Sequence, residues 1–259
     1  YTLLAEAGVP LEAKPFAVGV RLEIPQLRIN AAQYGKWAKH PNLGSASFRL
    51  TRKEENNARR CYSFCMCPGG EVISCASSQG MITSNGMSLS ARAEPFGNAA
   101  FLVPVERSDF PTPDALGGVA FQEALERKAF AAGGSNYALP AARLIDFLEN
   151  RVGDLPAERS CQQSAPAALQ EILPEFVTHT LRSAIPSMLG ELNRTPLEEA
   201  LLYASETRSS SPVRVLRDRD GQSSGVKGLY PCGEGSGHAG GIVSSALDGM
   251  KLAEYHALS

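Results

Sequence analysis

The sequence has no large excess of one charge and no long apolar run. Among its 259 residues, 25 Lys and Arg are balanced by 27 Asp and Glu, which leaves a formal net charge of -2. A net charge so close to zero gives no global electrostatic reason to expect binding to nucleic acid or to a membrane surface. No apolar stretch reaches the ~18 residues that a membrane-spanning helix needs.

The first residues lack an initiator Met, a basic segment and the apolar core of a signal peptide. Leu3, Leu4 and Ala7, followed by Gly8 and Pro10, instead predict the end of a helix. We therefore expect the chain to begin within a longer protein. With 43% hydrophobic and 20% charged residues, it has the composition of a globular protein with one large domain or two modest ones.

The six cysteines lack the paired C-x-x-C spacing of zinc and redox motifs. If residues 61–67 form a strand, alternation places Cys61, Cys65 and Cys67 on one face. Neighbours on that face are roughly 7 Å apart, too far for an unstrained disulfide between Cys65 and Cys67. Buried reduced thiols of a cytoplasmic protein are one interpretation. A redox-active thiol near a cofactor and a metal site are the other two.

Apolar periodicity predicts mostly strands up to about residue 105 and mostly helices after them, which indicates an α+β fold. We expect strands at 14–24, 48–52, 60–67, 71–75 and 101–105, an irregular segment at 25–47 and a turn at Asn85-Gly86. We expect helices at 119–131, 141–150, 169–176 and 177–189, with breaks at Pro174 and Pro186, and from Thr195 to about Tyr203.

The glycine-rich segment near the C-terminus has the most informative pattern. It predicts a short strand at 229–232, a loop at 233–241 and an amphipathic helix at 242–256. Residues 235–240, GSGHAG, satisfy G-x-G-x-x-G, the dinucleotide-binding fingerprint. The 19 residues after Gly240 are too few to add the second strand and acidic residue of a complete βαβ unit.

A glycine-rich loop before a helix still offers backbone N–H groups and the positive end of the helix dipole to an anion or a polarised oxygen. A purely structural tight turn is the alternative. Ser236 lacks glycines two residues to either side, so it is not the nucleophile elbow of a hydrolase. The four histidines show no metal-ligand spacing, and His238, inside the loop, is the one that we consider for function.

The segment VKGLYPCGEGSGHAGGIVSSALDGMKLAE resembles the C-terminal flavin-contacting motif of two-domain FAD-dependent oxidoreductases with the glutathione-reductase-like fold. Further segments resemble uncharacterised bacterial FAD-dependent dehydrogenases, often called NAD(P)/FAD-dependent oxidoreductases: GVPLEAKPFAVGVRLEIPQ, YSFCMCPGGEVISCAS, TSNGMSLSAR, FQEALERKAF and TRSSSPVRVLRD. The resemblance implies an inserted substrate-side domain at 1–206. It also implies that 207–259 supplies the last strand, loop and helix of the FAD domain, without the N-terminal Rossmann segment that holds the ADP pyrophosphate.

The resemblance also implies site residues. Glu234, between Gly233 and Gly235, has the place of the acidic residue that hydrogen-bonds the ribityl or pyrophosphate region of FAD. Gly240, Gly241 and Ile242 have the place of the backbone N–H groups at the flavin pyrimidine edge, where a helix N-terminus stabilises the anionic reduced flavin. Further candidates are Arg208, Ser210 and Arg214, which contact the cofactor or shape the domain junction, and Cys65 and Cys67, which face the flavin's substrate side.

Two functions from different classes follow. The first is part of a FAD-dependent dehydrogenase that transfers a hydride through flavin N5, with NAD(P)H as a candidate donor. The second is a non-catalytic substrate-recognition or interaction domain that does not bind FAD by itself. A hydrolase or a zinc protein is a distant third. Cys65, Cys67 and His238 are the catalytic candidates, and the substrate is not identified by the sequence.

Overall fold

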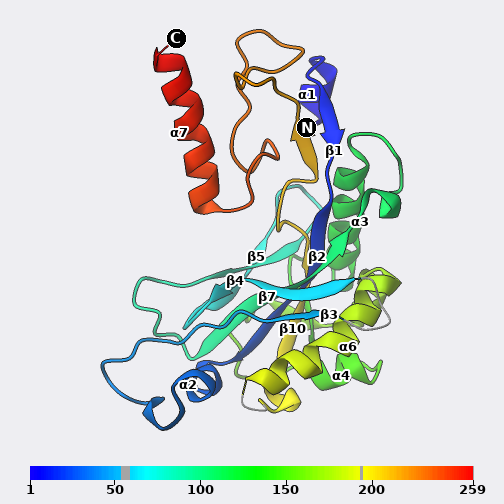
Figure 1. Cartoon of the computed structure of the whole chain (residues 1–259). Helices are drawn as coiled ribbons and strands as arrows, with labels where there is room; N and C mark the ends of the chain where they lie inside the picture. The colour runs from blue at the N-terminus through cyan, green and yellow to red at the C-terminus, as the bar shows by residue number, and fades with distance from the viewer. Residues whose placement is uncertain (54–58, 193–194, 259) are drawn as a thin grey trace. The chain divides into compact units, whose positions relative to one another are not determined.

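The computed structural model describes residues 1–53, 59–192 and 195–258 (Figure 1). Contacts within the chain divide it into two compact units. Unit 1 consists of residues 1–17, 105–123 and 208–259, and unit 2 of residues 18–104 and 124–207. The connection between the expected strands at 48–52 and 60–67 falls largely outside the described residues. None of the described helices is long and apolar enough to cross a membrane.

Unit 2 is built on a seven-stranded sheet with the strand order β3-β4-β7-β2-β10-β8-β9. Its strands are β2 (Phe16–Pro25), β3 (Thr51–Lys53), β4 (Arg60–Cys67), β7 (Phe96–Val105), β8 (Leu139–Arg143), β9 (Ser164–Pro166) and β10 (Leu201–Glu206). β8 and β9 pair in parallel, whereas β10 pairs antiparallel with both β2 and β8. A second, two-stranded sheet pairs β5 (Glu71–Cys75) with β6 (Thr83–Met87). These mixed sheets and the helices confirm the α+β class.

The helices of unit 2 are short except for one. They are α2 (Gln26–Tyr34), the 3-10 turns η1 (Gly35–Trp37) and η3 (Leu197–Glu199), α4 (Leu144–Leu148), α5 (Leu169–Ile172) and α6 (Glu175–Glu191). In Figure 1, α4 and α6 lie beside one another in yellow-green. α6 packs against β3 and β4 and buries Val177, Leu181 and Met188, which recur at helical spacing on one face.

Unit 1 carries the two ends of the described chain. Its elements are α1 (Thr2–Glu6), β1 (Leu11–Ala13), η2 (Arg107–Asp109), the first part of α3 (Gly117–Ala132), β11 (Val213–Val215) and α7 (Ile242–Leu258). β1 and β11 pair antiparallel, with Leu11 opposite Val215. The ring of Phe16 contacts those of Phe110 and Phe121, with ring centroids 5.6 and 5.9 Å apart. This aromatic cluster is a small core for the unit.

The expected strands at 14–24, 60–67, 71–75 and 101–105 are confirmed, as is the helix at 119–131. The expected turn at Asn85-Gly86 is wrong, because both residues lie inside β6 opposite Ile73 and Val72. Gly86 instead allows the side chains of Arg21 and Asn98 to lie close to the backbone of β6. A Cβ there would lie 2.1 Å from Asn98 Oδ1 and 2.3 Å from Arg21 Nη1.

Three expected helices differ in the structure. β8 extends to Arg143, and α4 begins only at Leu144, because residues 141–143 pair with β10. Thr195-Pro196 precedes a single 3-10 turn, after which residues 201–206 form β10, a strand buried along its whole length. Pro174 does separate α5 from α6, but α6 continues through Pro186. Burial in the sheet or against it outweighs local helix preference in these places.

Three loop expectations also need correction. Residues 26–37 form α2 and η1 within the segment expected to be irregular, although α2 buries only Gln26 and Ile29. Leu229–Cys232 is irregular, not a strand. In β4 the register shifts between Phe64 and Cys67, and Cys65 has φ +47°. This irregularity breaks the expected alternation, so Cys61 is buried while Cys65 is exposed.

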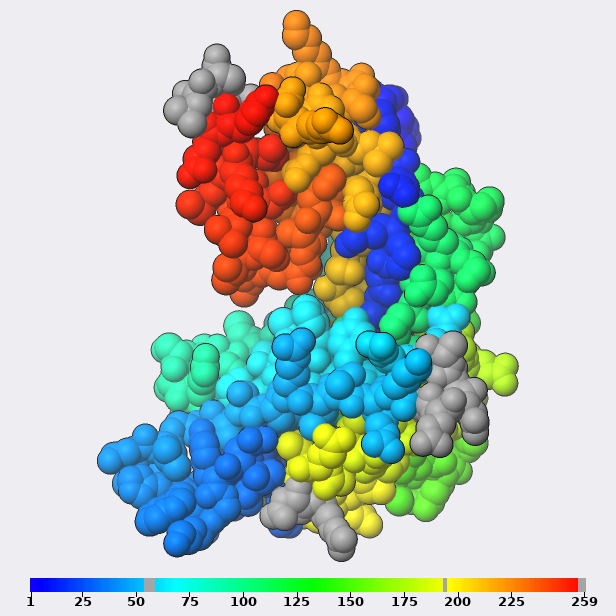
Figure 2. Space-filling view, in the orientation of Figure 1, coloured from blue at the N-terminus to red at the C-terminus, as the bar shows by residue number. Residues whose placement is uncertain are grey.

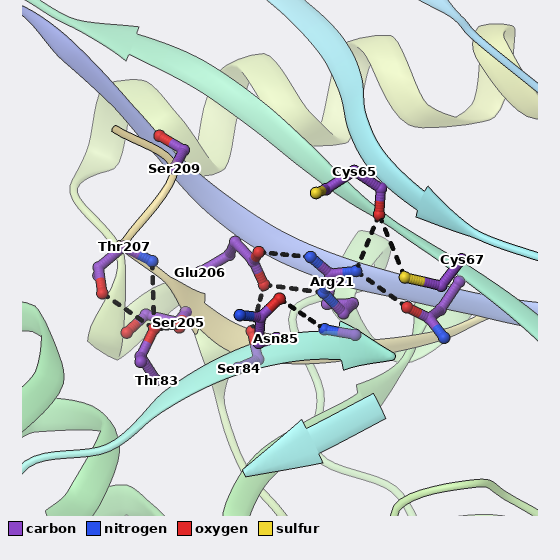
Figure 3. A network of polar contacts seen from close by, with 12 residues as sticks. Arg21, Cys65, Cys67, Thr83, Ser84, Asn85, Ser205, Glu206, Thr207 and Ser209 are labelled. Carbon is purple, nitrogen blue, oxygen red and sulfur yellow. Dashed lines mark hydrogen bonds and ion pairs between the residues drawn. The ribbon is translucent and has the colours of Figure 1, made fainter. Parts of the chain in front are cut away.

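A buried ion pair lies in the middle of unit 2 (Figure 3). Arg21 of β2, fully buried, donates from Nε and Nη2 to the two carboxylate oxygens of Glu206, at 2.9 and 2.5 Å. Its Nη1 donates to Asn98 Oδ1 at 2.9 Å and to the Cys65 carbonyl at 3.3 Å. Ser84 donates to Glu206 from β6. Five strands, β2, β4, β6, β7 and β10, therefore meet at one guanidinium–carboxylate pair.

The first prediction concerns this pair. Glu206→Gln leaves the buried Arg21 charge uncompensated and should lower the free energy of unfolding by about 3–5 kcal/mol. The matched control is Glu199→Gln, which breaks the equally bidentate Arg28–Glu199 pair, whose side chains are 49% and 32% exposed. The control should change little, because solvent screens an exposed pair. Urea unfolding followed by circular dichroism measures both, and equal losses would contradict the prediction.

The second prediction concerns Glu23, a buried carboxyl of β2. Burial raises its pKa, although Ser160 N–H and Tyr203 Oη–H donate to it. A raised pKa means that the folded state binds more protons, so Glu23 costs stability as pH rises above about 4.3, the value in unfolded chains. Glu23→Gln should therefore gain stability relative to the natural chain between pH 4 and pH 8. A difference that does not vary with pH, as expected for the exposed control Glu191→Gln, would contradict this.

Candidate functional site

The glycine-rich loop of unit 1 joins β11 to α7 through tight backbone turns. Gly233 and Gly237 have φ of +72° and +80°, in the left-handed region that favours glycine. A Cβ at Gly237 would lie 2.3 Å from the Val213 carbonyl oxygen. Gly237 therefore lets the loop lie directly against β11.

Hydrogen bonds hold the loop to β11. Val215 N–H donates to the Ser236 carbonyl at 3.0 Å, and the Ser236 hydroxyl donates to the Gly233 carbonyl at 3.0 Å. His238 Nε2 lies 2.8 Å from the Val215 carbonyl. Burial lowers the pKa of His238, so the ring is neutral at pH 7 and Nε2–H donates to that carbonyl. His238 thus has a structural contact that fixes the loop.

An acidic residue of α7 holds the beginning of the loop. Asp248 accepts hydrogen bonds from Arg217 Nη1 and Nη2, at 3.0 and 2.7 Å, and from the Gly233 N–H at 2.9 Å. The Arg217 hydrogen bonds lower the pKa of Asp248 to about 2. Arg217 also donates to the Pro231 carbonyl at 2.8 Å. One bidentate pair therefore fixes the position of α7 against the loop within unit 1.

The start of α7 is open to solvent. Gly240 and Ile242 are exposed and Gly241 is half-buried; the exposed fraction of Ile242 is 90%. The first N–H groups of a helix have no intrahelical acceptor, and they lie at the positive end of its dipole. Three of the expected cofactor residues thus form an accessible set of donors that suits an anion or a polarised carbonyl.

A small pocket of unit 1 brings further candidates together. It has a volume of about 210 Å³, and its lining includes Arg208, Ser210, Glu234 and Gly235. Arg208 and Ser210 lie more than twenty positions before Glu234 and Gly235 in the chain, and the sequence linked the two pairs only through the resemblance. Tyr1 also lines the pocket, and its hydroxyl donates to the Gly235 carbonyl at 2.7 Å. The pocket thus offers a guanidinium, hydroxyls and a carboxylate to a polar ligand.

The remaining candidates do not line this pocket. Arg214 of β11 is opposite Glu12 of β1, and its Nε donates to the Gly237 carbonyl of the glycine-rich loop at 3.5 Å. Cys65 and Cys67 belong to unit 2. Burial is the largest effect on Cys67 and raises its pKa, which keeps the thiol protonated and weakly nucleophilic. Within the described residues, no three His, Cys, Asp or Glu side chains are grouped as metal ligands would be.

Sequence reasoning missed three residues of this region and the ion pair of unit 2. Lys14 lies close enough to Glu234 and Arg214 for their charges to act on its pKa, which burial lowers. The Arg217–Asp248 pair gave no local sequence signal, because 30 residues separate its members. Arg21 did give one. A charged residue in the apolar run FAVGVRLEIP must be paired if the strand is buried.

The third prediction follows from the pair that holds the loop. Asp248→Asn should destabilise the protein at pH 7 by about 1–2 kcal/mol, since solvent screens part of the interaction. The lowered pKa means that the contribution is present above about pH 4 and is lost as the pH falls toward 2. Urea unfolding between pH 2 and pH 7 measures it. The control Glu254→Gln removes an exposed carboxylate of the same helix, and an equal effect there would contradict the prediction.

Comparisons with known proteins agree with part of this description. The family described as "FAD-dependent protein, C-terminal domain-like" matches residues 15–209, which include all of unit 2 and end before the glycine-rich loop. An uncharacterized protein of Clostridium beijerinckii is 43% identical over 258 residues, covering 98% of this chain. The chain spans about half of that relative, 48% of its length. Because the family match extends over most of the sequence, the chain belongs to the FAD-dependent protein, C-terminal domain-like family.

Proposed function

We propose that this chain is part of a FAD-dependent oxidoreductase, a dehydrogenase of the glutathione-reductase-like type. Residues 207–259 would supply the flavin-contacting loop and helix, and residues 1–206 the substrate-side domain. One observation carries the proposal. Four residues that the resemblance makes cofactor candidates, Glu234 and Gly235 together with the weaker candidates Arg208 and Ser210, line a single pocket within unit 1. The description of the matched family as FAD-dependent supports a flavin-associated role for the protein, although the match ends at residue 209, before Ser210, Glu234 and Gly235.

The residues present suit part of FAD. The Glu234 carboxylate can accept hydrogen bonds from ribityl hydroxyls, and the N–H groups at the start of α7 can donate to the pyrimidine edge of the flavin. Bound FAD would accept a hydride at its N5 atom, with NAD(P)H as a candidate donor. The role of this chain is to orient the flavin and to favour negative charge on its reduced form.

The pocket is too small for this chain alone to enclose a whole FAD molecule. Drug-sized ligands occupy pockets of about 300–1,000 Å³ and FAD is larger still, whereas this pocket measures about 210 Å³. The rest of the cofactor would lie on a Rossmann segment, which we assign to the other half of the longer relatives. The small volume also favours our second candidate function for the isolated chain, a recognition domain that does not retain FAD.

The exposed apolar side chains of α7 support the same arrangement. Val243, Leu247 and Met250 recur at helical spacing, and the exposed fraction of Val243 is 72%. The opposite side of the helix contacts unit 1, where Leu252 lies against Gly221. Surface helices seldom expose such a stripe without a partner. We propose that the Rossmann segment covers it. The six free cysteines support a cytoplasmic location.

The fourth prediction tests the cofactor. This protein, extended upstream to the length of its relative, should bind FAD and show the flavin absorption bands, whereas the present chain should stay colourless. In the extended protein, Glu234→Gln should weaken FAD binding by about 10- to 100-fold, since a hydrogen bond to a charged group is worth about 1.5–3 kcal/mol. Quenching of free-flavin fluorescence measures the dissociation constant.

The matched control is Glu12→Gln, the same chemical change at a carboxylate that pairs with Arg107 outside the pocket. It should leave FAD binding unchanged. An extended protein that folds but stays colourless with added FAD would rule out the oxidoreductase proposal. Unchanged binding by Glu234→Gln in a yellow protein would remove only the role assigned to Glu234.

A further inference from the structure

Unit 2 has a groove on its sheet that the flavin proposal does not use. Its volume is about 760 Å³, and it lies along β4 and the segment that leads into β3. Its lining includes Arg49, Arg60, Tyr62, Phe64 and Met66. All the lining residues belong to unit 2. In the space-filling view, atoms of β3 and β4, in blue to cyan, lie on the face toward the viewer (Figure 2).

The strand register explains why these side chains gather. Thr51 is opposite Tyr62 in the antiparallel pair β3–β4, so Arg49, two residues before Thr51, and Phe64, two residues after Tyr62, are on the same face. The alternate residues Cys61 and Ser63 are buried. One face of the hairpin thus contributes to the core, while the other presents half-buried aromatic rings between exposed cations.

The groove contains two guanidinium groups whose charge no carboxylate of the described residues balances. Arg49 and Arg60 are exposed, and no carboxylate among the described residues pairs with either. The neighbouring Arg59 differs, because it donates to the Pro104 carbonyl at 2.7 Å and lies 3.9 Å from the ring centroid of Phe176. Two cations beside aromatic rings, with no anion of their own, form a site complementary to a negatively charged ligand.

We propose that this groove binds a small aromatic carboxylate. An aromatic ring is the group that stacks on Tyr62 and Phe64 and contacts the Met66 thioether. A carboxylate is the planar anion that matches a guanidinium through two parallel hydrogen bonds. Burial raises the pKa of the Tyr62 phenol, so its hydroxyl remains a donor at neutral pH and can join the carboxylate.

The volume of the groove and the net charge of the whole chain favour a small molecule over a polymer. The volume lies within the range of about 300–1,000 Å³ that is usual for ligand pockets. Single-stranded nucleic acid also uses aromatic rings and cations, but it requires a positively charged groove that follows several nucleotides. The whole chain has a net charge of -2. The proposal requires no FAD, since no lining residue belongs to the flavin candidates other than Cys65.

The experiment uses the chain as it stands, without FAD, and 2-naphthoate as the probe. Isothermal titration should give saturable binding with one site. Arg49→Gln and Arg60→Gln, made separately, should each weaken it about tenfold or more, because each removes a charged hydrogen bond. The matched control is Arg52→Gln, the same change on the neighbouring position of β3, which does not line the groove. It should bind as the natural chain does.

A second ligand tests whether binding needs the negative charge, without any substitution in the protein. 2-Naphthalenemethanol has the same ring system without the charge and should bind at least tenfold more weakly than 2-naphthoate. Equal affinity for the two ligands, equal weakening by Arg52→Gln, or no saturable binding at millimolar 2-naphthoate would overturn the proposal. Tighter binding of a short oligothymidylate than of 2-naphthoate would overturn it in favour of a nucleic-acid surface. Circular dichroism of each variant confirms its fold.

Discussion

The ion pair between Arg21 and Glu206 is the constraint on which the structure of unit 2 depends. A guanidinium removed from water must have its charge and its donors satisfied, and here its four hydrogen bonds go to residues of three other strands, β4, β7 and β10. Glu206 in turn accepts from Ser84 of the second sheet. The packing of β5–β6 against the main sheet therefore requires Gly86, whose missing Cβ leaves room for Arg21.

Much of the fold could be predicted where the signal was local. The apolar alternation of 14–24 and the helical spacing of 119–131 placed β2 and most of α3 correctly. The predictions fail where pairing between strands far apart in the sequence determines the secondary structure. The run LLYASE has no local feature that separates helix from strand, and it becomes β10 because β2 and β8 flank it. Asn85-Gly86 is a turn pair by propensity, but β5 holds it in a strand.

The candidate site divides in the same way. The glycine-rich loop and the helix after it could be predicted, since positive φ at Gly233 and Gly237 and the helix start depend on adjacent residues. The residues that fix the loop could not. Arg217 and Asp248 become partners only when α7 folds back within unit 1, and His238 turns out to hold β11. The motif predicts which backbone N–H groups face a ligand. How rigidly the loop holds them depends on contacts between residues far apart in the sequence, and the spacing of the motif does not show these contacts.

The family match and the flavin motif concern different parts of the chain. Residues 15–209 carry the match and contain the whole of unit 2, while the glycine-rich loop lies beyond them. Within this chain, the matched residues therefore include the sheet, the buried Arg21–Glu206 pair and the groove along β4. A buried charge costs stability unless it is compensated, whereas water solvates an exposed cation. Arg21 is compensated within the fold, while the exposed Arg49 and Arg60 have no carboxylate partner among the described residues and are the groups that we propose bind an anionic ligand.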